Sequence, residues 1–116
     1  MIGIDIVSID RIEKLHKRFG TKGLERFLLP SELQEVNRIE SIAGYWAAKE
    51  AIAKALKCGI GKKLGFKDIE IYKEPSGAPN FRLLNHKEEL FLIQDRSLSI
   101  THDGGFAIAA AIILRR

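Results

Sequence analysis

One alanine-rich segment, residues 41–57, does most to restrict the folds open to this chain. The segment contains no proline, is rich in alanine, and is followed by a glycine at position 59. Alanine has the highest helix propensity and a glycine commonly ends a helix, so the sequence predicts one long helix over Ser41–Lys57. Because alanine side chains are small, other elements can pack closely against several sides of this helix. We therefore expect it to lie at the centre of the fold.

The rest of the chain mixes strand and helix patterns. Alternating or β-branched apolar residues predict strands over residues 1–9, 67–73, 80–84, 97–101 and 106–114. Shorter helices are predicted over residues 10–19, capped by Asp10, over 22–28, from Pro30 onward, and over 86–93. These elements do not alternate as a doubly wound parallel sheet requires. The prediction is therefore an α+β fold, with a mainly antiparallel sheet packed against the long central helix.

Length and composition are typical of one globular domain over residues 1–116. Hydrophobic residues make up 46% of the chain and charged residues 29%. The most apolar stretch, Phe106–Leu114, is shorter than the roughly 20 residues that a membrane-spanning helix needs, so we expect no membrane partner. A single cysteine, Cys58, excludes an intramolecular disulfide and a multi-cysteine metal site. Since the N-terminus also lacks a secretory signal pattern, we expect a cytoplasmic protein.

Positive charge is concentrated near the N-terminus. Between Arg11 and Arg26 there are six basic residues and two acidic ones, which accounts for the whole formal charge of +4. Such a local basic surface is typical either of a solvated helix face or of a docking site for an acidic partner. A small basic nucleic-acid-binding domain is the alternative function, given a pI of about 9.3. Aromatic and basic residues do not interleave on a predicted strand, however, so we expect no nucleic-acid partner.

Two carboxylates lie in apolar surroundings. Asp5 falls inside the first predicted strand, and Glu50 lies among the alanines of the long helix, one turn from Lys54. An ordinary i to i+4 ion pair would explain Glu50 and Lys54 alone. Brought together from strand and helix, the two carboxylates would suit Mg²⁺, which prefers oxygen ligands. Lys49 and Lys54 could then neutralise the oxygens of a phosphate substrate.

A histidine marks the last predicted turn. His102 opens the His-Asp-Gly-Gly sequence between two strands, where it could contact a phosphate, act as a base or simply stabilise the turn. No Ser, Thr or Cys lies in a recognisable nucleophile motif, which favours direct group transfer without a covalent enzyme intermediate.

Five short motifs, taken in order, resemble the holo-acyl-carrier-protein synthase family of 4'-phosphopantetheinyl transferases. They are Gly3-Ile4-Asp5-Ile6-Val7, Arg11-Ile12, Trp46-Ala47-Ala48-Lys49-Glu50-Ala51 with Lys54-Ala55, Ser76-Gly77-Ala78-Pro79, and Ser99-Ile100-Thr101-His102-Asp103. Each motif is weak alone, but their order, spacing and the total length agree with the family. Members often have serine where Thr101 stands, and threonine keeps the hydroxyl.

The resemblance implies the phosphopantetheinyl transferase fold, assembled as a homotrimer with active sites at the subunit interfaces. It implies that Asp5 and Glu50 bind magnesium, that Lys54 contacts the coenzyme A pyrophosphate, and that these residues and His102 are catalytic. Further contacts with coenzyme A are expected from Lys49, Gly77, Pro79, Thr101 and His102. The basic helix, through Arg11, Lys14 and Arg18, is expected to receive apo acyl carrier protein.

The implied reaction moves the 4'-phosphopantetheine group of coenzyme A onto a serine of apo acyl carrier protein, in fatty acid biosynthesis. It yields holo acyl carrier protein and adenosine 3',5'-bisphosphate. The serine must lose a proton, and Glu50, directly or through a metal-held water, is the first candidate for the base, followed by Asp103 and His102.

Overall fold

The computed structural model describes all residues from 1 to 116, and its main feature is a three-stranded antiparallel sheet. The strand order is β1-β5-β4, with β1 at Ile2–Ser8, β5 at Phe106–Arg115 and β4 at Ile93–Asp103. A separate antiparallel hairpin joins β2, Ile69–Lys73, to β3, Pro79–Leu83. Since every strand pair is antiparallel and helices pack against the sheet, the predicted α+β fold class is confirmed.

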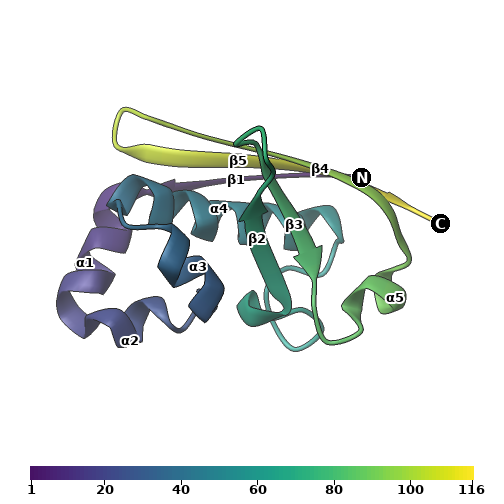
Figure 1. Cartoon of the computed structure of the whole chain (residues 1–116), viewed down its shortest axis with the longest axis horizontal. Coiled ribbons are helices and arrows are strands. Elements are labelled where there is room, and N and C mark those ends of the chain that lie inside the picture. Colours follow the sequence, from purple (N-terminus) through teal and green to yellow (C-terminus); the bar gives the residue numbers. More distant parts are fainter.

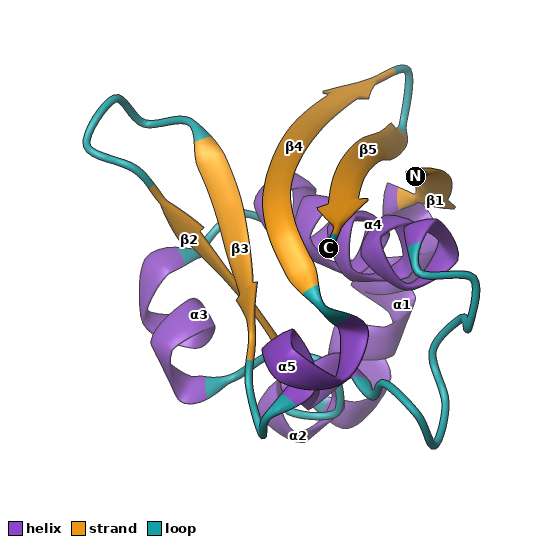
Figure 2. Cartoon of the chain, turned by 90° about the vertical axis from the view of Figure 1, so that its right-hand side faces the viewer, coloured by secondary structure: helices purple, strands orange, loops and turns teal.

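All the helices lie on one side of the three-stranded sheet (Figure 1). The long helix α4, Ile39–Ala55, runs directly beneath it, and the shorter helices lie further out. These are α1 at Ile9–Phe19, α2 at Thr21–Leu24, α3 at Pro30–Glu35 and α5 at Lys87–Phe91, with a single 3₁₀ turn, η1, at Phe66–Asp68. Figure 2 shows the β2–β3 hairpin standing beside β4, at the opposite edge of the sheet from β1.

Small residues set the contact between α4 and the sheet. Along β5, Ala107, Ala109 and Ala111 point toward α4 and are buried, because alternate residues of a strand share a face. The alanines at positions 47, 48, 51 and 55 of α4 are completely buried as well. All 28 buried apolar residues form one contiguous core around this contact. The central position predicted for the alanine-rich helix is therefore confirmed.

Gly3 allows β1 to cross α4 at backbone contact. A Cβ atom at this position would lie 1.9 Å from the carbonyl oxygen of Ala51 and 2.5 Å from the amide nitrogen of Ala55. Both distances are far below ordinary van der Waals contact, so only glycine fits here. Because Gly3 and Asp5 share a strand face, the crossing also brings Asp5 onto the same helix.

Several predicted boundaries move in the structure. Helix α4 begins at Ile39 and ends at Ala55 rather than Lys57, because the amides of Cys58 and Gly59 both turn back to the carbonyl of Ala53. Ser8, not Asp10, caps α1, accepting a hydrogen bond from the Arg11 amide at 3.4 Å. Helix α2 is shorter than predicted, and β4 is longer, starting at Ile93.

No helix in the structure combines the length and the apolar character that crossing a membrane would require.

Candidate active site

An ion pair joins the first strand to the long helix at the edge of the sheet. The Lys54 ammonium donates to Asp5 Oδ1 at 2.8 Å and to the carbonyl of Ile4 at 3.3 Å. The Asp5 side chain is 13% exposed, whereas that of Lys54 is 52% exposed. The contact with Asp5 raises the pKa of Lys54 above its ordinary value, so the ammonium stays charged at neutral pH. Asp5 and Lys54 line a shallow hollow of about 280 Å³ with Ile4, Ile6 and Ile108.

Glu50 lies half-buried next to this pair. Burial, and after it the negative charge of Asp5, raise the pKa of Glu50, and the charges of Lys54 and Arg11 only partly offset the rise. Two carboxylates in mutual repulsion favour a bound cation or a proton, since either removes the unfavourable charge. Asp5, Glu50 and Lys54, predicted to work together, are therefore neighbours in the fold.

Only two carboxylates, those of Asp5 and Glu50, are available at this position as ligands for a metal ion. No group of three or more His, Cys, Asp or Glu side chains could hold a metal ion. Two carboxylates fit Mg²⁺ better than a transition metal, because Mg²⁺ takes oxygen ligands and keeps several positions for water and substrate phosphate. Asp5 and Glu50 are thus the residues that could hold a magnesium ion.

A second hollow brings together three other predicted residues. Gly77 from the β2–β3 turn, Pro79 at the start of β3 and His102 from β4 line one pocket of about 200 Å³. Remaining wall residues come from the first half of α4, from the loop before it, from the hairpin and from β4: Val36, Glu40, Ser41, Tyr45, Lys73 and Ile100. Thr101 is not among them, because neighbouring residues of a strand point to opposite faces of the sheet.

The two hollows lie on opposite sides of α4. Glu50 follows Ser41 by nine residues, which is two and a half turns at about 3.6 residues per turn. Lys54 follows Tyr45 by the same interval. Ser41 and Tyr45 line the histidine pocket, so Glu50 and Lys54 face away from it. Within one chain, His102, Gly77 and Pro79 are therefore not next to the carboxylates of Asp5 and Glu50.

The position of Lys49 does not agree with the prediction that this residue contacts coenzyme A. Its side chain is completely buried, and its ammonium donates to Glu32 Oε1 at 2.7 Å, to the carbonyl of Phe27 at 2.7 Å and to that of Phe66 at 3.0 Å. Burial lowers the pKa of Lys49, although the charge of Glu32 opposes this. With all three of its N–H groups engaged, Lys49 has none left to contact a phosphate of coenzyme A.

The basic helix borders the carboxylates. Arg11, Lys14 and Arg18 line a groove of about 270 Å³ on α1, whose floor includes Phe19 and Trp46. The Arg11 guanidinium lies 5.3 Å from the centre of the Trp46 ring. Because Arg11 also influences the pKa of Glu50, the groove and the carboxylates form neighbouring parts of one surface.

Sequence reasoning missed the residues that complete these hollows. Ser41, Tyr45 and Lys73 in the histidine pocket belong to the long helix and the hairpin, and no charge pattern distinguishes them. Burial, together with the charges of Glu35 and Glu32, holds the pKa of Tyr45 above its ordinary value, so its hydroxyl stays protonated. The position of Lys73 just before the Ser-Gly-Ala-Pro turn was the one signal available in the sequence.

Comparisons with known proteins identify the family of this chain. The family model of the 4'-phosphopantetheinyl transferase superfamily matches residues 1–111. A holo-[acyl-carrier-protein] synthase from Nitratiruptor is 62% identical over 115 residues, covering 99% of both chains. The crystal structure of Helicobacter pylori holo-[acyl-carrier-protein] synthase in complex with coenzyme A is 56% identical, with a TM-score of 0.95 over 98% of this chain and 100% of that one. The Neisseria meningitidis enzyme is 33% identical, with a TM-score of 0.89 over 98% of this chain and 97% of that one.

The match extends over almost the whole chain in sequence and in three dimensions, as the five ordered motifs predicted. The chain therefore belongs to the holo-[acyl-carrier-protein] synthase family of the 4'-phosphopantetheinyl transferase superfamily.

Proposed function

We propose that this protein transfers the 4'-phosphopantetheine group of coenzyme A to a serine of apo acyl carrier protein in a Mg²⁺-dependent reaction. The products are holo acyl carrier protein and adenosine 3',5'-bisphosphate, and the pathway is fatty acid biosynthesis. The observation that carries the proposal is the contact of Asp5 with Lys54 beside the half-buried Glu50, in a chain of this family.

Asp5 and Glu50 are the residues that would hold magnesium. Burial raises the pKa of Glu50 and the negative charge of Asp5 raises it further, and this arrangement supports a cation between the two carboxylates. Bound there, Mg²⁺ would supply positive charge to the diphosphate of coenzyme A. Lys54 adds a second positive charge at the same place, because its exposed ammonium already lies against Asp5.

The transfer itself needs a proton acceptor and charge stabilisation. The serine oxygen forms a bond to the β-phosphorus of coenzyme A, and the bond from that phosphorus to the bridging oxygen breaks, releasing adenosine 3',5'-bisphosphate. Glu50, directly or through a water molecule held by the metal, is the first candidate to accept the serine proton, because it lies half-buried beside Asp5 and Lys54. Lys54 stabilises the negative charge that develops on the diphosphate.

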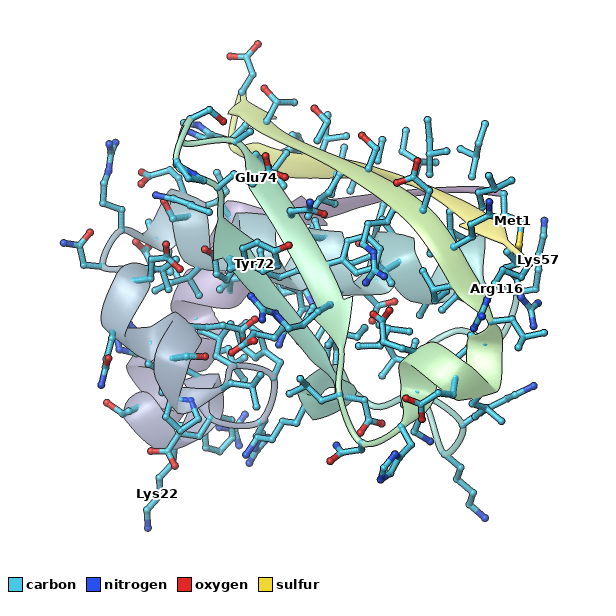
Figure 3. All side chains as sticks on the ribbon, turned by 45° about the vertical axis from the view of Figure 1, so that its right-hand side comes forward. Met1, Lys22, Lys57, Tyr72, Glu74 and Arg116 are labelled. Atoms are coloured by element: carbon cyan, nitrogen blue, oxygen red, sulfur yellow. The ribbon has the colours of Figure 1, made fainter.

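A second copy of the chain completes each site. The pocket with Gly77, Pro79 and His102 lies on the far side of α4, so a neighbour must present its own pocket to the carboxylates. An apolar face supports such an assembly: Ile2, Ile4 and Ile6 are 58–68% exposed on the sheet face opposite the helices. Figure 3 shows side chains standing out from this face with no helix over them. We propose the homotrimer that the family resemblance implies, with coenzyme A bound between subunits.

Apo acyl carrier protein docks on the groove of α1. Arg11, Lys14 and Arg18 offer positive charge, and the apolar floor of the groove offers contact area. An acidic carrier protein bound there would reach the carboxylates, because Arg11 lies close enough to Glu50 to affect its pKa.

Two further features complete the proposal. The single contiguous core supports one transferase domain over residues 1–116. A cytoplasmic location agrees with the composition and with a free Cys58.

Mass spectrometry of the carrier protein tests the proposed function. Incubation with apo acyl carrier protein, coenzyme A and Mg²⁺ should add the mass of one phosphopantetheine group, and a chelator should prevent the gain. A carrier protein whose mass does not change, with the enzyme folded and Mg²⁺ present, would reject the activity. Transfer that persists in chelator would reject the metal dependence.

A further inference from the structure

The only charged side chains that are completely buried form a single ion pair between α3 and α4. Glu32 and Lys49 are each 0% exposed, and their charged atoms lie 2.7 Å apart. A buried ion pair contributes little net stability, because removing both charges from water costs about as much as their attraction gains. Its presence at this position therefore calls for a role other than stability.

The pair connects three separate stretches of the chain: residues 27–32, helix α4 and residues 66–71. Besides Lys49, the carboxylate of Glu32 accepts from the amides of Leu29 and Ile71, each at 2.7 Å. Lys49 donates to the carbonyls of Phe27 and Phe66. No polar side-chain atom in the protein interior lacks a hydrogen-bond partner, so this network is saturated. A saturated, low-dielectric network tolerates only one relative placement of the segments it joins.

An aromatic cluster lies beside the network. The Phe27 and Trp46 rings lie 5.0 Å apart edge to face, and the Trp46 and Phe66 rings lie 4.7 Å apart. The same two phenylalanines supply the carbonyls that accept from Lys49. The ion pair and the aromatic cluster therefore order the same loops, and Trp46 also supports Arg11 of the basic groove.

The segments joined by this network contain residues from both parts of the proposed site: Glu50 on α4, and Gly77 and Pro79 after β2. Lys49 immediately precedes Glu50, so fixing Lys49 fixes the rotation of α4 and the direction of the Glu50 carboxylate. Ile71 lies in β2, which leads past Tyr72 and Glu74, labelled in Figure 3, into the turn with Gly77 and Pro79. The Glu32–Lys49 ion pair thus sets the distance, within each chain, between the Glu50 carboxylate and the β2–β3 turn that lines the pocket.

We propose that Glu32 and Lys49 are positioning residues, which hold Glu50 and the β2–β3 turn in the relative placement that transfer requires. This inference rests on the proposed function, in which each chain contributes its carboxylates to one active site and its histidine pocket to the neighbouring active site. A small rotation of α4 would then misalign both kinds of half-site in the assembly at once.

A paired substitution separates positioning from stability. Lys49→Met alone leaves a buried carboxylate unpaired and should lower the Tm by roughly 10–20 °C. Adding Glu32→Gln removes the remaining charge and keeps one amide oxygen that can accept from one of the two backbone amides, so part of the lost Tm should return. The matched control is Phe91→Ala, which truncates a buried side chain in α5. This variant should also lower the Tm, but Phe91 makes no contact with the ion-pair network.

Kinetics well below each Tm give the decisive comparison. For the double variant we expect kcat per folded molecule to fall by about 10- to 100-fold, because a displacement near 1 Å is enough for such a loss. The KM for coenzyme A should rise as well, since the turn moves with β2. Wild-type kcat and KM in the double variant would overturn the proposal, and so would an equal loss of kcat in the Phe91→Ala control.

Hydrogen exchange keeps this test independent of the activity. The amides of α4 around Glu50 and that of Ile71 should exchange at least tenfold faster in the double variant, and should remain slow in the control. If the wild-type protein transfers no phosphopantetheine, the proposed function fails while the exchange rates still report on positioning. Unchanged exchange at these amides would overturn the positioning role whatever the activity shows.

Discussion

Replacing Gly3 by alanine tests the contact on which the candidate site depends. The added Cβ would lie 1.9 Å from the Ala51 carbonyl oxygen, and ordinary contact begins near 3.4 Å. Strand and helix must therefore separate by about 1.5 Å, because both colliding groups are backbone atoms that cannot rotate away. Asp5, two residues further along β1, would move away from Glu50 and Lys54 by a similar amount.

The size of the effect follows from that displacement. Overpacking of this kind costs about 1–3 kcal/mol, which corresponds to a Tm loss of roughly 4–12 °C for a chain of this length. A displacement of about 1 Å in a catalytic group can reduce the rate about 100-fold. We therefore expect Gly3→Ala to lose at least about 100-fold in kcat while most of the protein remains folded at 25 °C.

Thermal denaturation followed by circular dichroism and transfer followed by mass spectrometry measure the two effects. Gly61→Ala is the matched control, because a Cβ there meets no atom within 4 Å and the residue does not have a positive φ. A Gly3→Ala protein with the Tm and the kcat of the control would show that β1 and α4 do not make this contact, and the placement of Asp5 would be refuted with it.

Four further outcomes are expected. Glu50→Gln should reduce transfer by at least about 100-fold with the Tm unchanged, and near-normal turnover would reject Glu50 as the base. Arg11→Glu should raise the KM for the carrier protein about tenfold at low salt and less at high salt, whereas a salt-independent effect would contradict electrostatic docking. Ile4→Asp should convert the assembly to single chains in light scattering and abolish transfer, and an intact oligomer would count against the apolar interface. Burial alone would raise the pKa of Glu88, but hydrogen bonds from Arg96 and from a backbone amide outweigh burial, so the pKa is lowered. The stability that Glu88 contributes is therefore present above about pH 4.3 and is lost as the pH falls further. Glu88→Gln should therefore flatten the fall of Tm between pH 5 and 3, and an unchanged slope would contradict this assignment.

Most of the helices and strands, and the family, could be predicted from the amino-acid sequence alone. Alanine content and the absence of proline predicted the central helix, and period-two alternation predicted the strands, because both patterns follow from local backbone geometry. Asp5 and Glu50 stood out since a charge among apolar residues needs a partner. The resemblance then supplied their roles, which no local pattern contains.

The different roles of Lys49 and Lys54 follow from tertiary contacts and could not be predicted from the sequence. Lys49 and Lys54 look alike in the sequence, yet five residues along a helix turn the side chain by about 140°, so one enters the aromatic core and the other reaches Asp5. The partner of Lys49, Glu32, is 17 residues away and lies in another helix, beyond the reach of any spacing rule. The separation of His102 from Glu50 by the width of α4 is likewise set by how the helix lies on the sheet. Local sequence patterns carry no information about that placement, because it arises from contacts between distant segments.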